Sequence, residues 1–473
     1  MIQEAGGRRQ EAGGKAVTYT HKLLVFTLTA GLSAALAASA PQRGSVPQGS
    51  PVKALVGGTL VDGYGGPPIR NSVIVVEGDR ITAVGRQGSL PVPAGAEVIS
   101  TEGMTVLPGL WDMHVHLMID GHADYDHWDR TYGSQLASVI MPASAKQLLL
   151  AGVTSARDLG APLEASISVR DRIRSGEIPG PTLYVSGPFI QHEPYPNTEA
   201  YRWGVKGPDD GRAKVARIAG AGVDVVKLID QDQMTLDEVR GVVDEAHRRG
   251  KPVVAHAHRP EEIRRGLAAG VDCFEHTGLA TAPAYPDDVI EGIRERTAKM
   301  SLGPLFWTPT IEGLLNYEYL RDNPEAMDDP AWHEGLPDAI VADIRRSLEH
   351  PDRLPYFQLT AARRPTLARK FKQLRDAGVV MLIGTDSGIP MNFHSQSTWR
   401  ELDAWVNLLG VDPITAIRAA TYWPSVAMKA NRDAGTVSAG KYADIIAVRG
   451  DALRYIALLQ RVDLVVKHGV RYR

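Results

Sequence analysis

The chain has 473 residues and a formal net charge of −3, with 44% hydrophobic and 23% charged residues. This balance is typical of a globular enzyme with a large core, and it excludes a strongly basic nucleic-acid-binding protein and a polybasic membrane-binding one. The single cysteine, Cys273, excludes an intramolecular disulfide. Because α/β barrels reach ~250 residues or more as one unit, the length permits one large domain with a smaller attachment.

The N-terminal segment has the features of a secretory signal peptide. An apolar run, Leu23–Leu36, follows a short basic segment, and the small residues after it fit the pattern of cleavage sites, with Ala37 preferred. The run is shorter than the ~20 residues that a membrane span needs, so an uncleaved membrane anchor is the less favoured alternative. We expect a periplasmic or secreted protein without a stable membrane span, in which residues 1–40 are the leader and 41–52 a linker.

Residues 53–104 and 433–473 are both rich in short predicted strands. Apolar, β-branched runs such as Ser72–Glu77 and Ala443–Val448 alternate with turns that contain Gly and Asp. The pattern predicts a small β-sandwich domain that is discontinuous in sequence, because its two parts bracket the rest of the chain.

Over residues 105–432, predicted strands and helices alternate, which indicates βα units around a parallel sheet. Thr235 and Glu238 form a capping box that predicts a helix ending at Gly250, and another helix is predicted over Pro365–Ala377. We expect a (β/α)8 barrel, built from the predicted strands Thr105–His116, Val153–Asp158, Thr182–Phe189, Asp224–Ile229, Pro252–His258, Asp272–His276, Phe306–Thr310 and Val379–Asp386.

Residues 311–364 form a long connection after the seventh predicted strand. Long loops of barrels usually belong to the active-site face. A lid over the site and a surface insertion that contacts another subunit are the two alternatives that the sequence leaves open, so a homo-oligomer is also left open.

The ends of the predicted strands, where barrels place their chemistry, carry side chains that suit a metal. His114 and His116 stand one residue apart, so both point to one face of a strand, with Asp112 one step deeper on the same face. Imidazoles at this spacing suit a divalent ion such as zinc. Other predicted strands end in further candidate ligands: Lys227, His256, His258, His276 and Asp386.

Lys227 stands inside an apolar strand, where an ammonium group is costly unless it is neutralised or paired. Addition of CO2 would convert its amine into a carbamate that can bridge two cations, and an ion pair with a carboxylate is the structural alternative. His256 and His258 share a strand face, and their spacing does not decide which one binds metal. Asp386 lies where a strand meets a turn, so its carboxylate suits a metal ligand and proton acceptor, or a helix N-cap.

These motifs resemble the amidohydrolase superfamily. Within it, the group of metal-dependent prolidases, imidazolonepropionase and the ochratoxin-hydrolysing enzymes is the most similar, and the resemblance covers nearly everything after the leader. It rests on P-G-L-W-D-M-H-V-H at residues 108–116, V-D-V-V-K at 223–227, V-A-H-A at 254–257, F-E-H at 274–276 and G-T-D-S-G at 384–388.

The resemblance implies a binuclear centre of two divalent ions, expected to be zinc. A hydroxide and carboxylated Lys227 would bridge the ions, and Asp386 would act as general base and acid. Asp112 would orient a ligand histidine, while His258 and His192 become candidate contacts to the ligands or the substrate. The implied metal ligands are His114, His116 and Asp386 for one ion, His256 and His276 for the other, with Lys227 between them.

We therefore expect an enzyme that hydrolyses an amide C–N bond of a small molecule, either a dipeptide or an N-acyl amino acid. Residues 191–196 read Q-H-E-P-Y-P where many prolidase-like members carry a G-G-H-G-type segment, so the dipeptide is one option of two. The alternatives are a cyclic-amide (imidazolone or lactam) hydrolase, a mononuclear deaminase and a non-catalytic periplasmic binding protein on a retired barrel. Deaminases typically carry H-A-G-E where residues 256–259 read H-A-H-R, and a retired site would have lost ligands.

Overall fold

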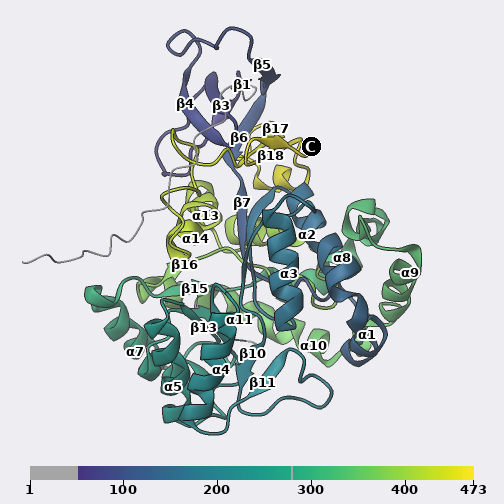
Figure 1. Cartoon of the computed structure of the whole chain (residues 1–473), viewed down its shortest axis with the longest axis vertical. Helices are drawn as coiled ribbons and strands as arrows, with labels where there is room; N and C mark the ends of the chain where they lie inside the picture. The colour runs from purple at the N-terminus through teal and green to yellow at the C-terminus, as the bar shows by residue number, and fades with distance from the viewer. Residues whose placement is uncertain (1–51, 279–280) are drawn as a thin grey trace, which may run out of the picture. The chain divides into compact units, whose positions relative to one another are not determined.

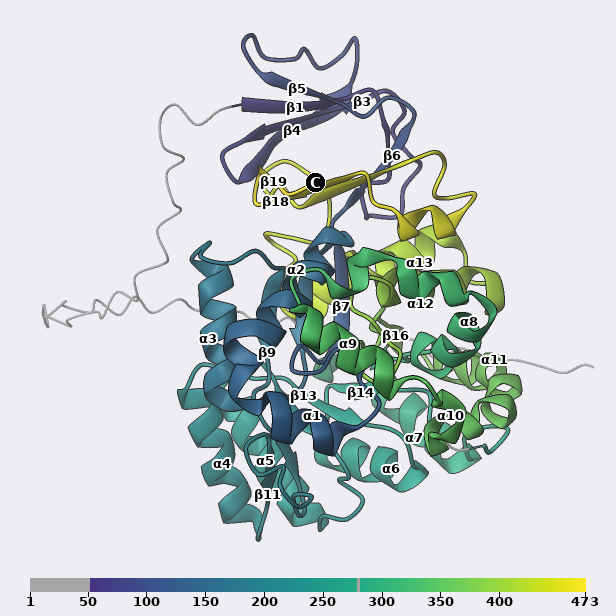
Figure 2. The same ribbon diagram turned by 90° about the vertical axis from the view of Figure 1, so that its right-hand side faces the viewer.

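The computed structural model describes residues 52–278 and 281–473, the coloured part of the chain in Figure 1. The predicted leader and all but the last residue of the predicted linker lie outside this range. Among the described residues, no helix combines the length and the apolar character needed to cross a bilayer. The architecture is mixed α/β with parallel strands, as the sequence predicts, and Figure 2 shows the helices around these strands from a second direction.

Two small sheets contain the first and last strands of the described chain. The antiparallel pairing of β6 with β17 sets Pro108 opposite Ile445, so segments from both ends of the chain form one sheet. The first sheet has the order β4-β3-β1-β5, with β1 (Val52–Val56), β3 (Ser72–Glu77), β4 (Arg80–Arg86) and β5 (Glu97–Ser100). The second has the order β19-β18-β17-β6-β2, with β2 (Thr59–Leu60), β6 (Met104–Pro108), β17 (Ile445–Arg449), β18 (Leu464–Lys467) and β19 (Val470–Arg471).

The remaining strands form two parallel sheets. The smaller has the order β7-β8-β9, with β7 (Leu110–Val115), β8 (Val153–Asp158) and β9 (Thr182–Val185). The larger has the order β11-β10-β12-β13-β14-β15-β16. Its strands are β10 (Phe189–Gln191), β11 (Arg202–Gly204), β12 (Val226–Leu228), β13 (Val253–His256), β14 (Cys273–Glu275), β15 (Phe306–Thr308) and β16 (Val380–Met381).

Backbone hydrogen bonds connect the two parallel sheets at both of their sides. Met113 N donates to Ile383 O at 3.0 Å, which places β7 beside the segment that follows β16. Asp224 N donates to Val185 O at 2.8 Å, which places β9 beside the segment that leads into β12. The strands that carry the candidate ligands therefore lie next to one another.

Helices separate most of the parallel strands along the chain, whereas β9, β10 and β11 follow one another without a helix. The predicted capping box is present at the start of α5, where Thr235 N donates to Glu238 Oε2 at 2.8 Å and Glu238 N donates to Thr235 Oγ1 at 3.3 Å. The α-helices are α1 (Tyr125–Tyr132), α2 (Met141–Leu150), α3 (Leu163–Arg174), α4 (Pro208–Gly220), α5 (Leu236–Arg248), α6 (Pro260–Ala269), α7 (Asp287–Ala298), α8 (Asn316–Asp322), α9 (Asp338–Ser347), α10 (Pro355–Gln358), α11 (Thr360–Asp376), α12 (Ser397–Asp403), α13 (Pro413–Ala419) and α14 (Tyr422–Ala427).

Several predicted boundaries are wrong for local reasons. The strand predicted over Thr105–His116 divides at Gly109, where a Cβ would lie 2.1 Å from Thr154 Oγ1, so only glycine permits this close approach. The helix predicted to begin at Pro365 begins at Thr360 and contains the proline within its first two turns. Residues 311–364 are not an irregular loop, because they contain α8, α9, α10 and the start of α11.

Candidate metal centre

His114, His116 and Asp386 meet where β7 and the segment after β16 run side by side. His116 Nε2 lies 3.0 Å and His114 Nε2 3.4 Å from Asp386 Oδ1. Asp386 has a φ of 60°, a backbone conformation that is uncommon outside glycine. Its backbone N donates to His114 O at 2.7 Å, so the bond between the two segments helps to hold this conformation. Such outliers cluster at functional sites.

His256, His258 and His276 form a second group beside the first. The ring centroid of His276 lies 4.7 Å from that of His256 and 4.3 Å from that of His258, with nearly parallel planes. One ring nitrogen of each residue lies within 4.8 Å of the others, as a shared metal ligand set requires. The sequence left the choice between His256 and His258 open, and the structure places both rings in the group.

The unpaired atoms of these side chains fit metal ions. Among the described residues, His114 Nε2 and His276 Nε2 are buried without a hydrogen-bond partner, as are the Nδ1 atoms of His256 and His258. A buried polar atom left unpaired costs about 1–3 kcal/mol. The other nitrogen of His276, Nδ1, lies 2.8 Å from Thr310 Oγ1, which leaves Nε2 for a ligand. Imidazole nitrogens with a carboxylate oxygen are the donor set that zinc prefers.

The electrostatic environment disfavours protonation of three of the histidines. Burial lowers the pKa of His114, His256 and His276 well below its ordinary value, and the positive charge of Lys227 lowers it further. Because a metal ligand must be neutral imidazole, this shift favours metal binding over protonation.

Lys227 lies at the centre of β12 and is fully buried. Its Nζ has no hydrogen-bond partner in the described part of the chain, so the predicted alternative of a hydrogen-bonded ion pair is not seen. Burial lowers the pKa of the amine to about 8, against the attraction of Glu275 and Asp386. A fraction of the amine is therefore unprotonated near neutral pH, and this form is the one that reacts with CO2.

Glu275 and Arg157 are site residues that the sequence analysis missed. Glu275 Oε2 lies 2.9 Å from His114 Nδ1, and Arg157 Nη2 donates to Glu275 Oε1 at 2.6 Å. Glu275 thereby fixes the ring of His114 with Nε2 directed at Asp386. The available signal was an acidic residue inside a buried strand, directly before a candidate ligand.

Asp112 contacts a candidate ligand through the backbone, and His192 lines a different cavity. Asp112 Oδ1 accepts hydrogen bonds from the backbone N atoms of His114 and Thr385, both at 3.1 Å, so it holds His114 through the backbone and not through the ring. His192 is exposed, directly follows β10 and lines a separate cavity with Glu193.

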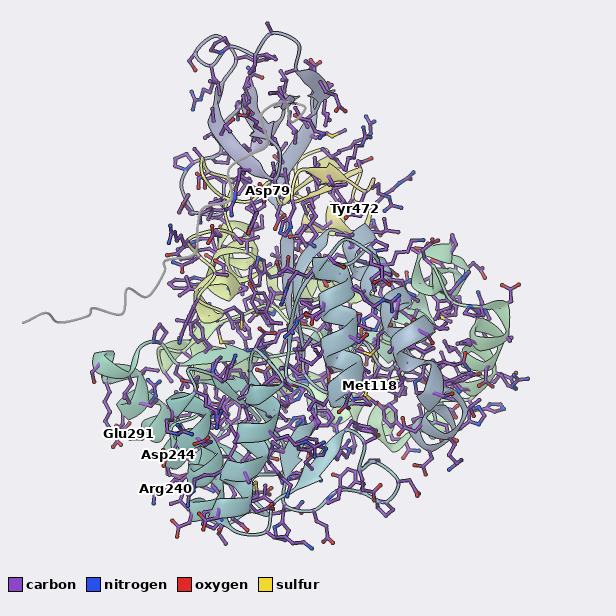
Figure 3. All side chains as sticks on the ribbon, viewed as in Figure 1. Asp79, Met118, Arg240, Asp244, Glu291 and Tyr472 are labelled. Carbon is purple, nitrogen blue, oxygen red and sulfur yellow. The ribbon has the colours of Figure 1, made fainter. Side chains whose placement is uncertain are left out.

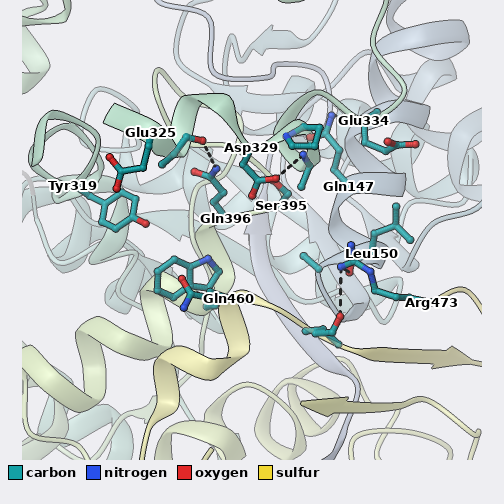
Figure 4. Close-up of a pocket in the computed structure, with 16 residues that line it drawn as sticks. Gln147, Leu150, Tyr319, Glu325, Asp329, Glu334, Ser395, Gln396, Gln460 and Arg473 are labelled. Carbon is teal, nitrogen blue, oxygen red and sulfur yellow. Dashed lines mark hydrogen bonds between the residues drawn. The ribbon is translucent and has the colours of Figure 1, made fainter. Parts of the chain in front are cut away.

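A cavity of about 520 Å³ opens onto the cluster. His116, His256 and Asp386 form one part of its wall, and Met118, labelled in Figure 3, forms another. No described residue of the segment 311–364 lines it. Another cavity, of about 390 Å³, lies around Gln147, Gln396 and Arg473 and contains none of the candidate ligands (Figure 4). The 520 Å³ cavity is therefore the candidate active site.

Comparisons with known proteins identify the family of the chain. The family model described as the amidohydrolase family matches residues 105–471. The chain belongs to the amidohydrolase family. It is therefore a hydrolase acting on carbon–nitrogen bonds, the enzyme class that the sequence predicts.

The individual relatives have low sequence identity to this chain, but the matches cover most of both chains. Ochratoxinase from Aspergillus niger is 24% identical over 457 residues, covering 86% of this chain and 83% of the relative. Imidazolonepropionase from Streptomyces coelicolor is 24% identical over 410 residues, covering 85% of this chain and 92% of the relative. The crystal structure of a Xaa-Pro dipeptidase with bound methionine in its active site matches with a TM-score of 0.70 at 25% identity, over 89% of this chain and 100% of that one.

Proposed function

We propose that this amidohydrolase cleaves the amide bond of a dipeptide or an N-acyl amino acid at a centre of two zinc ions. The observation that carries the proposal is the convergence of imidazole nitrogens and a carboxylate on one cavity, with an unpaired buried amine close enough to shift the pKa of these histidines. The likeness to a Xaa-Pro dipeptidase and to ochratoxinase supports the same bond type.

Each group has a definite task in this proposal. His114, His116 and Asp386 would hold one ion. His256 and His276 would hold the other. Lys227, as a carbamate, would contact both. Bound zinc lowers the pKa of water towards ~7 and polarises a carbonyl. Asp386 would accept the proton of the attacking water and return it to the leaving amine. The same carboxylate would therefore act first as general base and then as general acid.

We also propose that the two parallel sheets close into a (β/α)8 barrel over residues 105–432. The hydrogen bonds from Met113 to Ile383 and from Asp224 to Val185 support this closure. Residues 53–104 and 433–473 would form the attached β-sandwich domain, supported by the pairing of β6 with β17. The proposed periplasmic or secreted location rests on the sequence of residues 1–40 alone.

A cyclic-amide hydrolase is the second candidate, favoured by the likeness to imidazolonepropionase. A mononuclear deaminase would need one ion, whereas two of the candidate ligand groups among the described residues lie beside the same cavity. A non-catalytic binding protein is disfavoured because all six predicted ligand side chains are present and five of them belong to these two groups.

The test combines metal analysis with a substrate panel. We expect two zinc ions per chain, and bicarbonate should increase the activity of protein reconstituted with zinc, cobalt or manganese. The panel contains dipeptides, N-acyl amino acids, lactams and an imidazolone, and chelated protein is the control. Turnover of a linear amide by the two-metal protein supports the proposal, turnover of cyclic amides alone supports the second candidate, and no turnover by fully loaded protein refutes both.

A further inference from the structure

The wall of the 520 Å³ cavity contains an arginine that forms no salt bridge in the described part of the chain. We infer that Arg202 binds a free carboxylate of the substrate, so that the enzyme selects amides whose amine part is an α-amino acid. This inference rests on the proposed function and assigns the residue that recognises the carboxylate of its substrate. Arg202 begins β11 and lines the same cavity as His116, His256 and Asp386.

Aromatic rings fix the position of the guanidinium. Arg202 Cζ lies 4.5 Å from the ring centroid of Tyr195, 5.0 Å from that of Phe189 and 5.6 Å from that of Tyr201. Ring faces attract a cation, but they accept no strong hydrogen bond from its N–H groups. The arrangement therefore orients the guanidinium and leaves most of its donors available.

The hydrogen-bonding partners of Arg202 are few. Nη1 donates to Gln191 Oε1 at 3.2 Å, and Nε is buried without a partner. In the described part of the chain, Arg202 forms no salt bridge, whereas Arg259 of the neighbouring loop pairs with Asp230 and Asp232. A buried guanidinium donor without an acceptor is costly unless a ligand supplies one.

The acidic residues near Arg202 are occupied by tyrosines. Tyr201 OH donates to Asp129 Oδ2 at 2.6 Å, and Tyr195 OH donates to Asp230 Oδ2 at 2.8 Å. These contacts hold both carboxylates to hydroxyl groups instead of to the guanidinium. An incoming carboxylate therefore meets a preorganised cation, and a planar guanidinium can bind it through two parallel hydrogen bonds.

The distance between Arg202 and the cluster suits a short amino acid unit. The His116 ring centroid lies 5.8 Å from that of Phe189, which lies 5.0 Å from Arg202 Cζ, so Arg202 is within about 11 Å of the His116 ring. An α-carboxylate carbon is two bonds from the scissile nitrogen, at ~1.5 Å per bond. With ~2 Å for a zinc–nitrogen bond and ~2.8 Å for a charged hydrogen bond, these lengths add to about 8 Å, which lies within the upper limit of about 11 Å.

The test compares N-acetyl-L-phenylalanine with N-acetyl-L-phenylalaninamide, which lacks the negative charge. For the zinc-loaded protein, calorimetry should show that Arg202→Gln weakens binding of the acid by about 10–100-fold, as expected for a hydrogen bond to a charged group. Binding of the amide should change less than about threefold, and Arg202→Lys should be intermediate because it retains charge without the planar fork. Where the acid is hydrolysed, its KM should rise more than its kcat falls.

Arg217→Gln is the matched control. Arg217 lies on α4 over the ring of Trp203 at 4.6 Å and does not line the 520 Å³ cavity, so its variant should bind both compounds like the unmodified protein. Equal weakening of acid and amide binding by Arg202→Gln, or no weakening of either, overturns the inference. Charge-dependent binding without turnover of any amide would support Arg202 as the anion site and count against the proposed reaction, so the two failures are distinguishable.

Discussion

Glu275 offers the sharpest test of how the protein prepares a metal ligand. Both of its oxygens have hydrogen-bond partners: Oε2 faces His114 Nδ1 at 2.9 Å, and Oε1 accepts from Arg157 Nη2 at 2.6 Å and from Cys273 Sγ at 3.1 Å. Both oxygens are therefore needed as acceptors when His114 binds a metal through Nε2. Glu275→Gln keeps the shape of the side chain but leaves one acceptor, so either His114 or Arg157 must face an NH2 group.

The expected effect follows from this lost acceptor. Removing the partner that orients a ligand histidine typically costs 10–100-fold in metal affinity, and we expect zinc binding of Glu275→Gln to weaken by about this factor. If the NH2 group faces Arg157 instead, the buried guanidinium loses a charged partner, which costs up to about 3–5 kcal/mol of folding free energy. Reduced zinc affinity and a lowered melting temperature are thus the two results that the geometry allows.

The assay is a competition titration of metal-free protein with zinc and a chromophoric chelator, together with a thermal melt. Glu245→Gln is the control, because Glu245 also accepts hydrogen bonds from arginines, Arg248 and Arg249, but lies on α5 outside the cluster. If Glu275→Gln binds zinc and melts like the unmodified protein, then Glu275 does not position His114.

Three further outcomes are expected. Asp386→Asn should retain most of its metal but lose about 10²–10⁴-fold in turnover, the usual worth of general acid–base catalysis, and full activity would remove Asp386 from that role. Lys227→Ala should lose at least one of two metal ions in elemental analysis, and unchanged content would refute the bridge. Burial raises the pKa of Asp120 from 3.8 to about 8, so the folded state holds its proton at a pH where the unfolded chain has released it. The stability due to Asp120 should therefore fall by ~1.4 kcal/mol per pH unit as the pH rises through that window, and Asp120→Asn should flatten the melting temperature between pH 5 and 8. Parallel pH profiles would contradict this assignment.

Local pattern predicts the strands well where the strand is uninterrupted. The bounds of β3 and β8 agree with the predicted Ser72–Glu77 and Val153–Asp158, because an apolar run with turn residues at both ends fixes a strand locally. The last predicted strand, Val379–Asp386, keeps only Val380–Met381 as β16. A Cβ on Gly384 would lie 2.8 Å from His114 N, so the contact with β7, and not the local sequence, shapes this segment.

The candidate site likewise has a part that local sequence predicts and a part that depends on contacts between distant segments. Strand periodicity and strand ends indicate which side chains face the cavity, and five of the six predicted metal ligands belong to the two observed groups. His256 and His258 share one strand face, and the directions of their rings depend on packing against other strands. The sequence alone therefore could not predict which of the two rings joins the ligand group. Glu275 was missed because its role depends on Arg157, a residue of a different strand. Asp112 was predicted to orient a ligand histidine, but a strand pattern does not distinguish the backbone contact that it makes from a contact with the ring.

The pairing of β6 with β17 has a consequence for synthesis in the cell. β6 leads through Gly109 into β7, which carries His114, yet the partner of Pro108 in this pairing is Ile445. Ribosomes add ~5–20 residues per second, so β6 waits roughly 20–70 s before its partner has been translated. During that time an apolar strand edge stays open to wrong partners, and contacts this far apart in sequence form slowly. Removal of the last strands should therefore impair acquisition of the active site during folding, although they contribute no residue to it.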